Sequence, residues 1–479
     1  MFHVLIAVIY YTISVNCGAG RFNSLIVFFA KNKQTFRVCR VRWRKLWYTH
    51  SHNPRMKSET SIYVHIPFCE RRCAYCDFNT YAGQEDALPA YVDALIQEIN
   101  FVGRQIANRQ LLITIPTVFF GGGTPSLLSP SQFDSILQAL RAAFVFSPNA
   151  EISVEANPNT VTLENLSALR AMGINRISYG AQSANAEELR LLERTHNFYD
   201  VVEAVSNSRK AGFDNLNLDL IYGCPQQTLQ TWRTTLQRIV DLNPEHISAY
   251  ALTLEHGTPF GRWAAKGLLP VPNPDLAAEM YEYAEEFLAS NGYEHYEISN
   301  WARINAEYRM QNAELEIPNS SFLISHSAFV CRHNLQYWRS LPYLAFGAGA
   351  HGYANGYRYS NALRIKTYIE RIANYKLPIS NYEFPLTPAA VNQHKQTLKD
   401  DMTDYMLNNL RLTNAGVAAT DFQLRFGRGL LDVYPKEIEE SIRNGLLEKK
   451  TSEVLETSEV FRLTKRGRLL GNQVFLRFV

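Results

Sequence analysis

The chain has 479 residues, of which 46% are apolar and 12% aromatic, and its formal net charge is +3. This length predicts two or three domains with a large core, and the apolar fraction excludes a disordered protein. The nearly balanced charge gives no support for a nucleic-acid partner. Three of the seven cysteines are clustered, which favours metal ligation in a reducing cytoplasm over a disulfide framework.

Residues 1–55 form an N-terminal extension to which the sequence assigns no role. The apolar run from Phe2 to Val15 is shorter than the ~20 residues that a membrane-spanning helix needs. It also lacks the positively charged start of a signal peptide. Met56 stands just ahead of the first predicted strand, so we expect the extension to be translated from upstream of the functional part. A membrane-associating tail is the alternative.

The most informative segment is a loop of three cysteines that follows a strand predicted at 61–66. Cys69, Cys73 and Cys76 have the spacing C-x3-C-x2-C, and no fourth cysteine lies nearby. Structural zinc sites and complete 4Fe–4S sites take four protein ligands. Three thiolates would instead hold a cluster and leave one iron open to a small molecule. Three structural cysteines, or a zinc site completed by a distant ligand, are the alternatives that spacing leaves open.

A second predicted strand, at 115–121, runs into three glycines followed by Thr124 and Pro125. Glycines allow a close approach of the backbone to a ligand and expose amide groups. No Gly-Lys-Ser/Thr follows, so this is not a Walker phosphate loop. Beside the cysteine loop, the turn is predicted to be a shelf for a cofactor.

Strands and amphipathic helices then alternate, which indicates a parallel sheet that curls into a barrel. Strands are predicted at 61–66, 115–121, 151–155, 175–180, 215–220, 246–253 and 293–298. Helices are predicted at 90–105, 130–144, 163–172, 200–211, 228–241 and 274–290. Two further helices, 395–410 and 435–444, precede short strands at 447–449 and 460–463, a pattern that indicates a small winged-helix-like domain.

These motifs resemble the oxygen-independent coproporphyrinogen III oxidase superfamily of radical S-adenosylmethionine (SAM) proteins. The resemblance covers about residues 57–479 and rests on the cysteine loop, on Gly-Gly-Gly-Thr-Pro-Ser, and on segments 155–158, 173–183, 217–223 and 296–301. It implies an α/β fold, an incomplete (βα)6 radical SAM barrel with a C-terminal winged-helix-like domain. The expected limits are 1–55 for the extension, 56–300 for the barrel core, 301–386 for a covering segment, and 387–479 for the C-terminal domain.

Within the superfamily the chain is most similar to the haem chaperone branch, HemW. Oxidases carry a fourth cysteine two places after the third, where this chain has Phe78. The segment 333–338 resembles the H-N-x-x-Y-W motif associated with haem handling in that branch. The resemblance therefore implies that His333, Asn334, Tyr337 and Trp338 contact haem, because imidazole can ligate iron and aromatic rings pack on a porphyrin.

A turn whose aromatic residues pack on the barrel is the alternative for this motif. Residues 304–330, which precede the motif, are also longer than the corresponding stretch of HemW-like sequences. This insertion leaves the geometry of the haem site open.

The resemblance implies a 4Fe–4S cluster on Cys69, Cys73 and Cys76, with SAM at its open iron. The SAM contacts that it implies are Tyr63, Tyr75, Gly122, Gly123, Thr124, Glu155, Gln182, Arg194 and Asp219. Glu155 and Asp219 are predicted at strand ends, where carboxylates can hold ribose hydroxyls or the methionyl amine. Arg194 could pair with the methionyl carboxylate as a bidentate fork; a salt bridge is the alternative for each. His246, His256 and His351 are expected to be structural, and His65 to pack at a strand end.

The expected function is binding of haem as cargo and its delivery to apo-haemoproteins, membrane-associated ones included. Oxidation of coproporphyrinogen III through a 5′-deoxyadenosyl radical, a step of porphyrin biosynthesis, is the first alternative, and the missing fourth cysteine argues against it. A cluster-bearing protein without turnover is the second. The sequence leaves open whether SAM is consumed and whether the chain dimerises.

Overall fold

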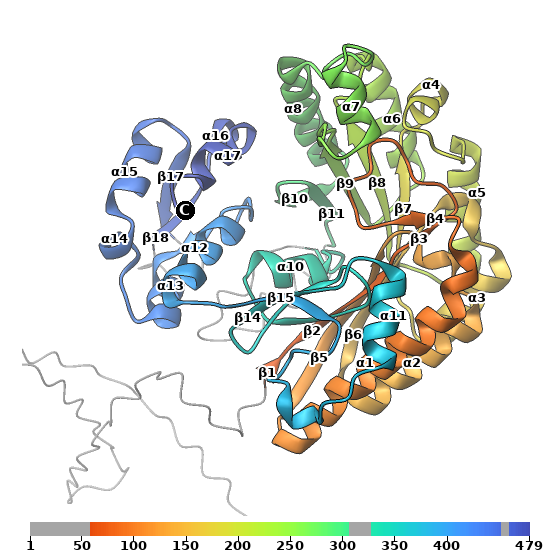
Figure 1. Ribbon diagram of the computed structural model, residues 1–479. Helices are drawn as coiled ribbons and strands as arrows, with labels where there is room; N and C mark the ends of the chain where they lie inside the picture. Colours follow the sequence, from red (N-terminus) through yellow and green to blue (C-terminus); the bar gives the residue numbers. More distant parts are fainter. Residues whose placement is uncertain (1–57, 306–326, 452–458) are drawn as a thin grey trace, which may run out of the picture. The chain divides into compact units, whose positions relative to one another are not determined.

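The computed structural model describes residues 58–305, 327–451 and 459–479 (Figure 1). The predicted extension, the start at Met56 and most of the insertion at 304–330 lie outside the described residues. Within the described ranges, no helix has both the length and the apolar character needed to cross a bilayer.

One large sheet organises the greater part of the described chain. Its strand order is β10-β11-β9-β8-β7-β6-β5-β2-β12-β13-β14-β15, with β1 paired to β5. The run from β12 to β9 is parallel throughout, and it contains six strands in chain order: β2, β5, β6, β7, β8 and β9. The strands beyond each end of this run are antiparallel. The sheet thus ends in two separate edge strands, so the barrel is incomplete.

The strand bounds are β1 Ser58–Glu59, β2 Ser61–Ile66, β3 Phe68–Cys69, β4 Tyr81–Ala82, β5 Ile113–Gly122, β6 Val145–Ala156, β7 Arg176–Gln182, β8 Leu216–Tyr222, β9 His246–Ala251, β10 Tyr293–Glu297, β11 Asn300–Arg303, β12 Tyr343–Phe346, β13 His351–Ala354, β14 Tyr357–Asn361 and β15 Ala390–Lys395. The seven predicted strands are confirmed, with ends that shift by a few residues. The strands β12 to β15 were not predicted.

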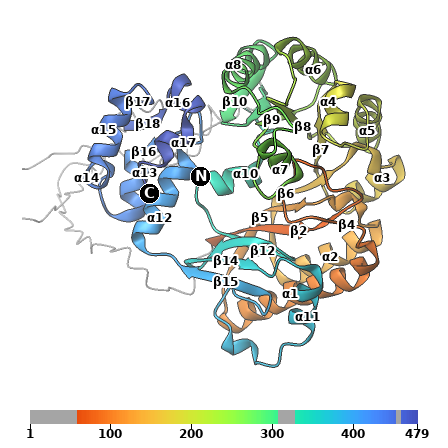
Figure 2. The same cartoon turned by 45° about the horizontal axis from the view of Figure 1, so that its top comes forward.

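Most helices follow the parallel strands and lie along the outer side of the sheet, whereas the helix Arg332–Trp338 (α10) lies on its inner side, where His333 lines a cavity (Figures 1 and 2). Their bounds are α1 Leu88–Arg109, α2 Pro130–Ala143, α3 Leu163–Ala171, α4 Ala186–Leu191, α5 Phe198–Lys210, α6 Leu229–Asp241, α7 Pro259–Ala265, α8 Pro274–Ser290, α10 Arg332–Trp338 and α11 Ile365–Ala373. Short 3-10 turns occupy Glu85–Ala87, Pro125–Leu127, Pro158–Thr160 and Ile379–Asn381.

Local sequence explains why these elements form where they do. β5 reads Ile-Thr-Ile-Pro-Thr-Val-Phe-Phe and is buried along almost its whole length, as expected of a parallel strand covered on both faces. Capping boxes at Ser129 and Thr228 begin α2 and α6, because the side-chain oxygen accepts a bond from a free amide of the first turn. The sheet and its helices therefore share one continuous apolar core.

A second, separate core lies in the C-terminal part and includes Met406, Leu410, Phe422, Ile438 and Phe461. Its elements are α12 Leu398–Asn409, β16 Val417–Ala418, α13 Ala419–Phe426, α14 Leu430–Val433, α15 Pro435–Arg443, β17 Leu447–Thr451, β18 Glu459–Leu463, α16 Lys465–Leu469 and α17 Gly471–Phe475. The strands form a small antiparallel sheet in the order β16-β18-β17. The predicted fold class is confirmed. The predicted limit at residue 387 precedes β15, which pairs with β14 in the large sheet.

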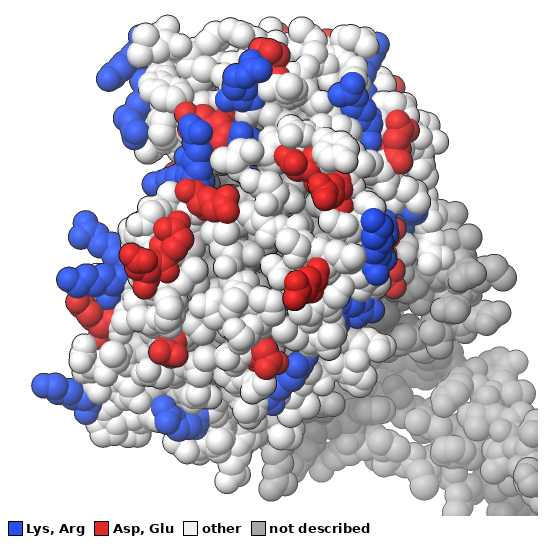
Figure 3. All heavy atoms as spheres, turned by 90° about the vertical axis from the view of Figure 1, so that its right-hand side faces the viewer, with Lys and Arg blue, Asp and Glu red and all other residues white. Residues whose placement is uncertain are grey.

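Acidic and basic side chains are interspersed on the face drawn in Figure 3, and on this face the described residues form no broad area of one charge sign. On this face, therefore, positive and negative side chains are mixed over short distances, in keeping with the nearly balanced net charge of the sequence.

Candidate cofactor site

The three cysteines of the predicted cluster lie in one loop that leaves the C-terminal end of β2. Cys69 is 9% exposed, Cys73 and Cys76 are partly exposed, and all three are free thiols. The loop is held by Ala74, which packs in a small apolar cluster with Phe260 and whose carbonyl accepts a hydrogen bond from the Phe260 amide (3.0 Å). The carboxyl ends of parallel strands are where α/β barrels place reactive groups.

Hydrogen-bond donors surround the sulfurs. The Thr124 hydroxyl donates to Cys69 Sγ (3.5 Å), and Arg194 Nη1 donates to Cys73 Sγ (3.5 Å). Burial raises the pKa of the Cys69 thiol to about 11, and the bond from Thr124 opposes this rise. Cys69 is therefore a protonated thiol in the free protein, and a metal would have to displace its proton.

No three His, Cys, Asp or Glu side chains among residues 58–305, 327–451 and 459–479 converge on a point that a single metal ion could occupy.

Two of the three glycines at the end of β5 are required by close packing, Gly122 against a side chain of β2 and Gly123 against the start of the cysteine loop. A Cβ at Gly123 would lie 2.5 Å from the Phe68 carbonyl oxygen, and one at Gly122, whose φ is +109°, would overlap the His65 ring. The expectation that these amides are exposed is wrong. The amides of Gly123 and Thr124 donate to the carbonyls of Ile66 and Phe68 (2.9 and 2.7 Å), and Gly122 donates to Glu155 Oε2 (2.9 Å).

Several predicted SAM contacts gather beside the cysteine loop. Arg194 Nη2 donates to Asn157 Oδ1 (2.5 Å) and to the Gly180 carbonyl (2.9 Å). Asn157 in turn donates to the Thr124 hydroxyl (3.2 Å), so it links the arginine to the glycine turn. Gln182 also lies here, next to Gly180, at a φ of +65°. Tyr75 packs against Phe260 from within the cysteine loop.

Asn157 was missed by the sequence analysis, although it lies in the Glu-Ala-Asn-Pro segment that carried part of the resemblance. Its position two residues after Glu155, directly beyond the end of the parallel strand β6, was the available signal.

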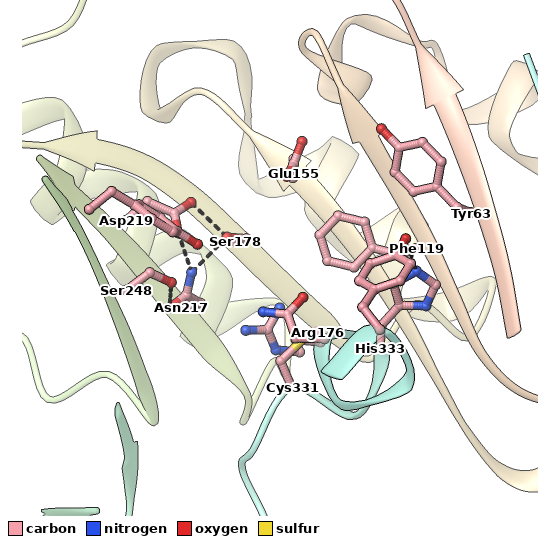
Figure 4. A pocket seen from close by; sticks show the side chains of 13 residues that line it. Tyr63, Phe119, Glu155, Arg176, Ser178, Asn217, Asp219, Ser248, Cys331 and His333 are labelled. Carbon is pink, nitrogen blue, oxygen red and sulfur yellow. Dashed lines mark hydrogen bonds between the residues drawn. The ribbon is translucent and has the colours of Figure 1, made fainter. Parts of the chain in front are cut away.

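The other three predicted SAM contacts, Tyr63, Glu155 and Asp219, line a cavity of about 180 Å³ inside the barrel (Figure 4). Asp219 accepts hydrogen bonds from Ser178 (2.8 Å) and Asn217 (2.8 Å). It lies in the middle of β8 rather than at its predicted end. Burial raises the pKa of Glu155 to about 7, and the nearby Asp219 carboxylate adds to the rise. A carboxyl that titrates near neutrality inside a cavity is a common feature of ligand sites.

The H-N-x-x-Y-W motif forms α10, whose first amides are capped by a carboxylate. Glu151 accepts bonds from the amides of Arg332 (3.0 Å) and His333 (3.1 Å). The His333 ring is 1% exposed and stacks on Phe119 with centroids 5.2 Å apart. Its Nδ1 bonds to the Thr117 hydroxyl (2.7 Å) and its Nε2 to the Tyr337 hydroxyl (2.9 Å).

His333 thus uses both ring nitrogens within the protein. To ligate iron it would have to give up one of these bonds, so its haem role stays a prediction. Asn334 faces the barrel cavity together with His333.

Comparisons with known proteins identify the family of this chain. Residues 63–239 match the Radical SAM superfamily, and residues 396–470 match the HemN C-terminal domain. Heme chaperone HemW of Bacillus subtilis is 34% identical over 423 residues, which cover 88% of this chain and 99% of that protein. Heme chaperone HemW of Lactococcus lactis is 32% identical over 424 residues, 88% of this chain and 98% of that protein.

The chain belongs to the HemW family.

Its fold is also similar to that of coproporphyrinogen III oxidase, HemN, from Escherichia coli, with a TM-score of 0.69, 24% identity, and coverage of 88% of this chain and 90% of that one. At this level of identity the similarity concerns the fold. Membership of the radical SAM superfamily implies a 4Fe–4S cluster and SAM.

A second cavity of this HemW-family chain lies next to the cysteine loop and has a volume of about 680 Å³. Tyr63 and Tyr337 line both this cavity and the one inside the barrel. Phe78, which stands where oxidases carry the fourth cysteine, is 70% exposed and faces the larger cavity. Trp338 lines it as well. The larger cavity thus brings together Phe78 and the end of the H-N-x-x-Y-W motif, two features that are far apart in the sequence.

Proposed function

We propose that this protein is a haem chaperone that binds haem and delivers it to apo-haemoproteins, and that it carries a 4Fe–4S cluster with SAM at the open iron. The observation that carries the proposal is the nearly full-length similarity to two relatives named heme chaperone HemW. The acceptors include membrane-associated apo-proteins, and we place the protein in the cytoplasm, where its free thiols stay reduced.

The donor set around the loop fits a cluster. Three free thiols lie on one short loop, two of them with hydrogen-bond donors at the sulfur, and such donors stabilise a thiolate. When bound, the cluster would supply an iron with an open coordination position and a source of one electron. Cys69, Cys73 and Cys76 would hold three irons. A Cβ at Gly123 would push the loop and the glycine turn apart.

The chain's polar groups fit SAM as well. Arg194 forms no ion pair with a carboxylate of the described residues, whereas it contacts Cys73, Asn157 and Gly180. We therefore assign it to the methionyl carboxylate, beside the open iron. Glu155 and Asp219 would accept bonds from the amine or the ribose hydroxyls, and Tyr63 would close the site between the two cavities.

The test is a two-part anaerobic assay of the cluster-loaded protein. One sample is titrated with haem, and the other receives coproporphyrinogen III, SAM and reductant. The proposal predicts stoichiometric haem binding and no catalytic formation of protoporphyrinogen. Catalytic turnover of coproporphyrinogen would overturn it in favour of the oxidase, and the absence of both signals would leave a cluster-bearing protein without turnover.

A further inference from the structure

We propose that the larger cavity is the haem site of this protein, and that His351 supplies the nitrogen ligand to the haem iron in place of His333. The inference rests on the proposed function and deepens it by naming the cavity and the ligand.

The larger cavity has the size and walls that a porphyrin needs. Its volume of about 680 Å³ lies within the range of pockets that enclose small organic ligands and cofactors. Its walls include Phe78, Tyr337, Trp338, Tyr343 and Tyr353, and flat aromatic rings pack favourably on a flat conjugated ligand. The barrel cavity, at about 180 Å³, is too small for a macrocycle.

His351 is the histidine with free ring nitrogens in this region of the described chain. Its side chain is exposed, it lines the cavity, and no hydrogen bond or ion pair of its ring occurs within the described residues. His65 also lines the cavity, but its Nδ1 bonds to the Tyr63 hydroxyl (2.8 Å) and its Nε2 to the Asn79 carbonyl (3.0 Å). His333 is likewise saturated. A neutral imidazole with an unused nitrogen is the usual axial ligand of haem iron.

Tyrosine, the other side chain in this wall that can ligate haem iron, is engaged elsewhere. The Tyr63 hydroxyl bonds to His65, that of Tyr337 to His333 (2.9 Å), and that of Tyr353 to Asp401 (2.9 Å). The hydroxyl of Tyr343, the fourth tyrosine of this wall, accepts a bond from the Arg358 side chain. The sequence analysis expected His351 to be structural, but the ring makes no structural contact of that kind. An exposed imidazole with no partner on an aromatic cavity wall fits a ligand better.

The backbone aims His351 at the cavity. It begins β13, whose alternate residues Tyr353 and His351 both line the cavity, as expected of residues two apart on a strand. Arg358, paired with Tyr353 across β13 and β14, lies on the same wall. Gly352 faces the other way, where a Cβ would overlap the Tyr359 ring. The turn before β13 is pinned by Asn79, which donates to the Ala348 carbonyl (3.1 Å).

The hydrogen bond from Asn79 to the Ala348 carbonyl also places the cavity beside the cysteine loop. Asn79 follows Asp77 and Phe78, which line the cavity, and these follow Cys76 directly in sequence.

The charged side chains of the cavity set the orientation of the bound haem. Arg358, the single Lys or Arg among the lining residues described, is already paired with Asp404 (2.7 Å). The haem propionates should therefore point out of the cavity into water, with the iron beside His351.

The experiment is an anaerobic titration of the cluster-loaded full chain with ferric haem, followed by the Soret absorbance. His351→Ala should weaken binding by about tenfold or more and remove the spectrum of nitrogen-ligated iron. Added imidazole should restore that spectrum, which a merely structural role of His351 would not produce. His394→Ala is the matched control, because His394 is an exposed histidine of the same sheet that is paired with Asp400 (3.1 Å). It should bind haem like the wild type.

Phe78→Ala separates the wall from the ligand. It should weaken haem binding about threefold to tenfold while the spectrum of ligated iron persists. Unchanged affinity and spectrum in His351→Ala, or loss of the ligated spectrum in a cluster-retaining His333→Ala variant alone, would overturn the inference and leave the proposed function intact. Failure of the wild type to bind haem saturably would overturn the proposed function, and the inference with it.

Discussion

Replacing Glu155 by glutamine should stabilise the protein at high pH. Glu155 lies in the barrel cavity, accepts a bond from the Gly122 amide, and has a pKa raised from 4.5 to about 7, chiefly by burial. Each pKa unit corresponds to about 1.4 kcal/mol. After allowance for the partial exposure of the side chain, keeping this carboxylate ionised in the folded state costs about 2–3 kcal/mol.

The sign follows from linkage. An acid whose folded pKa is raised destabilises the fold as pH rises from its unfolded pKa towards its folded pKa, because the unfolded chain releases the proton more readily. Glutamine keeps the acceptor for the Gly122 amide without the charge. We therefore expect the free energy of unfolding of Glu155→Gln to be higher than that of the wild type by less than about 1 kcal/mol at pH 5 and by about 2–3 kcal/mol at pH 8.5.

The assay is urea unfolding of the cluster-free, reduced protein at both pH values, compared as a difference between variants. Glu203→Gln, at an exposed position in the middle of α5, is the control and should show no pH-dependent difference. In a separate, cluster-loaded sample, added SAM should stabilise the wild type more than Glu155→Gln, because donors from the ligand offset the cost of the carboxylate. An equal difference at pH 5 and pH 8.5, or a less stable glutamine variant at pH 8.5, would refute the reasoning.

Three further predictions concern the cluster loop and the core. Cys73→Ala should remove the cluster, seen as loss of iron, sulfide and visible absorbance, whereas Cys224→Ala, at a buried cysteine outside the loop, should retain it; equal iron and sulfide in both would contradict the ligand assignment. Gly123→Ala should destabilise the protein by about 1–3 kcal/mol and lower its cluster content, because the new Cβ meets two carbonyl oxygens. Gly257→Ala is the control and should do neither, because the atom nearest to its new Cβ is 3.8 Å away. Normal cluster loading of Gly123→Ala would contradict this account of the packing. Glu98→Ala should lower the free energy of unfolding by about 3 kcal/mol or more, because the buried carboxyl group accepts bonds from Gly347, Asn361, Tyr368 and Thr387. In urea unfolding, the control Asp93→Ala, at an exposed position, should stay within about 0.5 kcal/mol of the wild type. A similarly small effect of Glu98→Ala would contradict this account.

The parallel core was predictable from sequence because its strands are rich in β-branched and aromatic residues. β2 and β5 are examples, and each leads directly into a loop of chemical interest. The family resemblance then supplied the order of the motifs. The strands β12 to β15 escaped prediction because β12, β13 and β14 have only four or five residues each and β15 is mostly polar. Their pairing partners are distant in sequence or are themselves short strands.

The site was harder to predict, because side-chain environment depends on non-local contacts. The glycine amides are taken up by carbonyls of Ile66 and Phe68, from another strand and its loop. The surroundings of His333 and His351 could not be predicted for the same reason. The first is enclosed by Thr117 and Tyr337, and the second stands exposed at the start of a strand that the sequence did not reveal.

Haem delivery tests the central claim most directly. The haem-loaded protein would be mixed with the apo-form of a haem b protein, and the same quantity of haem on serum albumin would serve as the passive donor. The account predicts that the acceptor gains haem one-for-one as this protein loses it, and faster than from albumin. Retention of the haem, or transfer at the rate seen with albumin, would contradict a role as a haem chaperone.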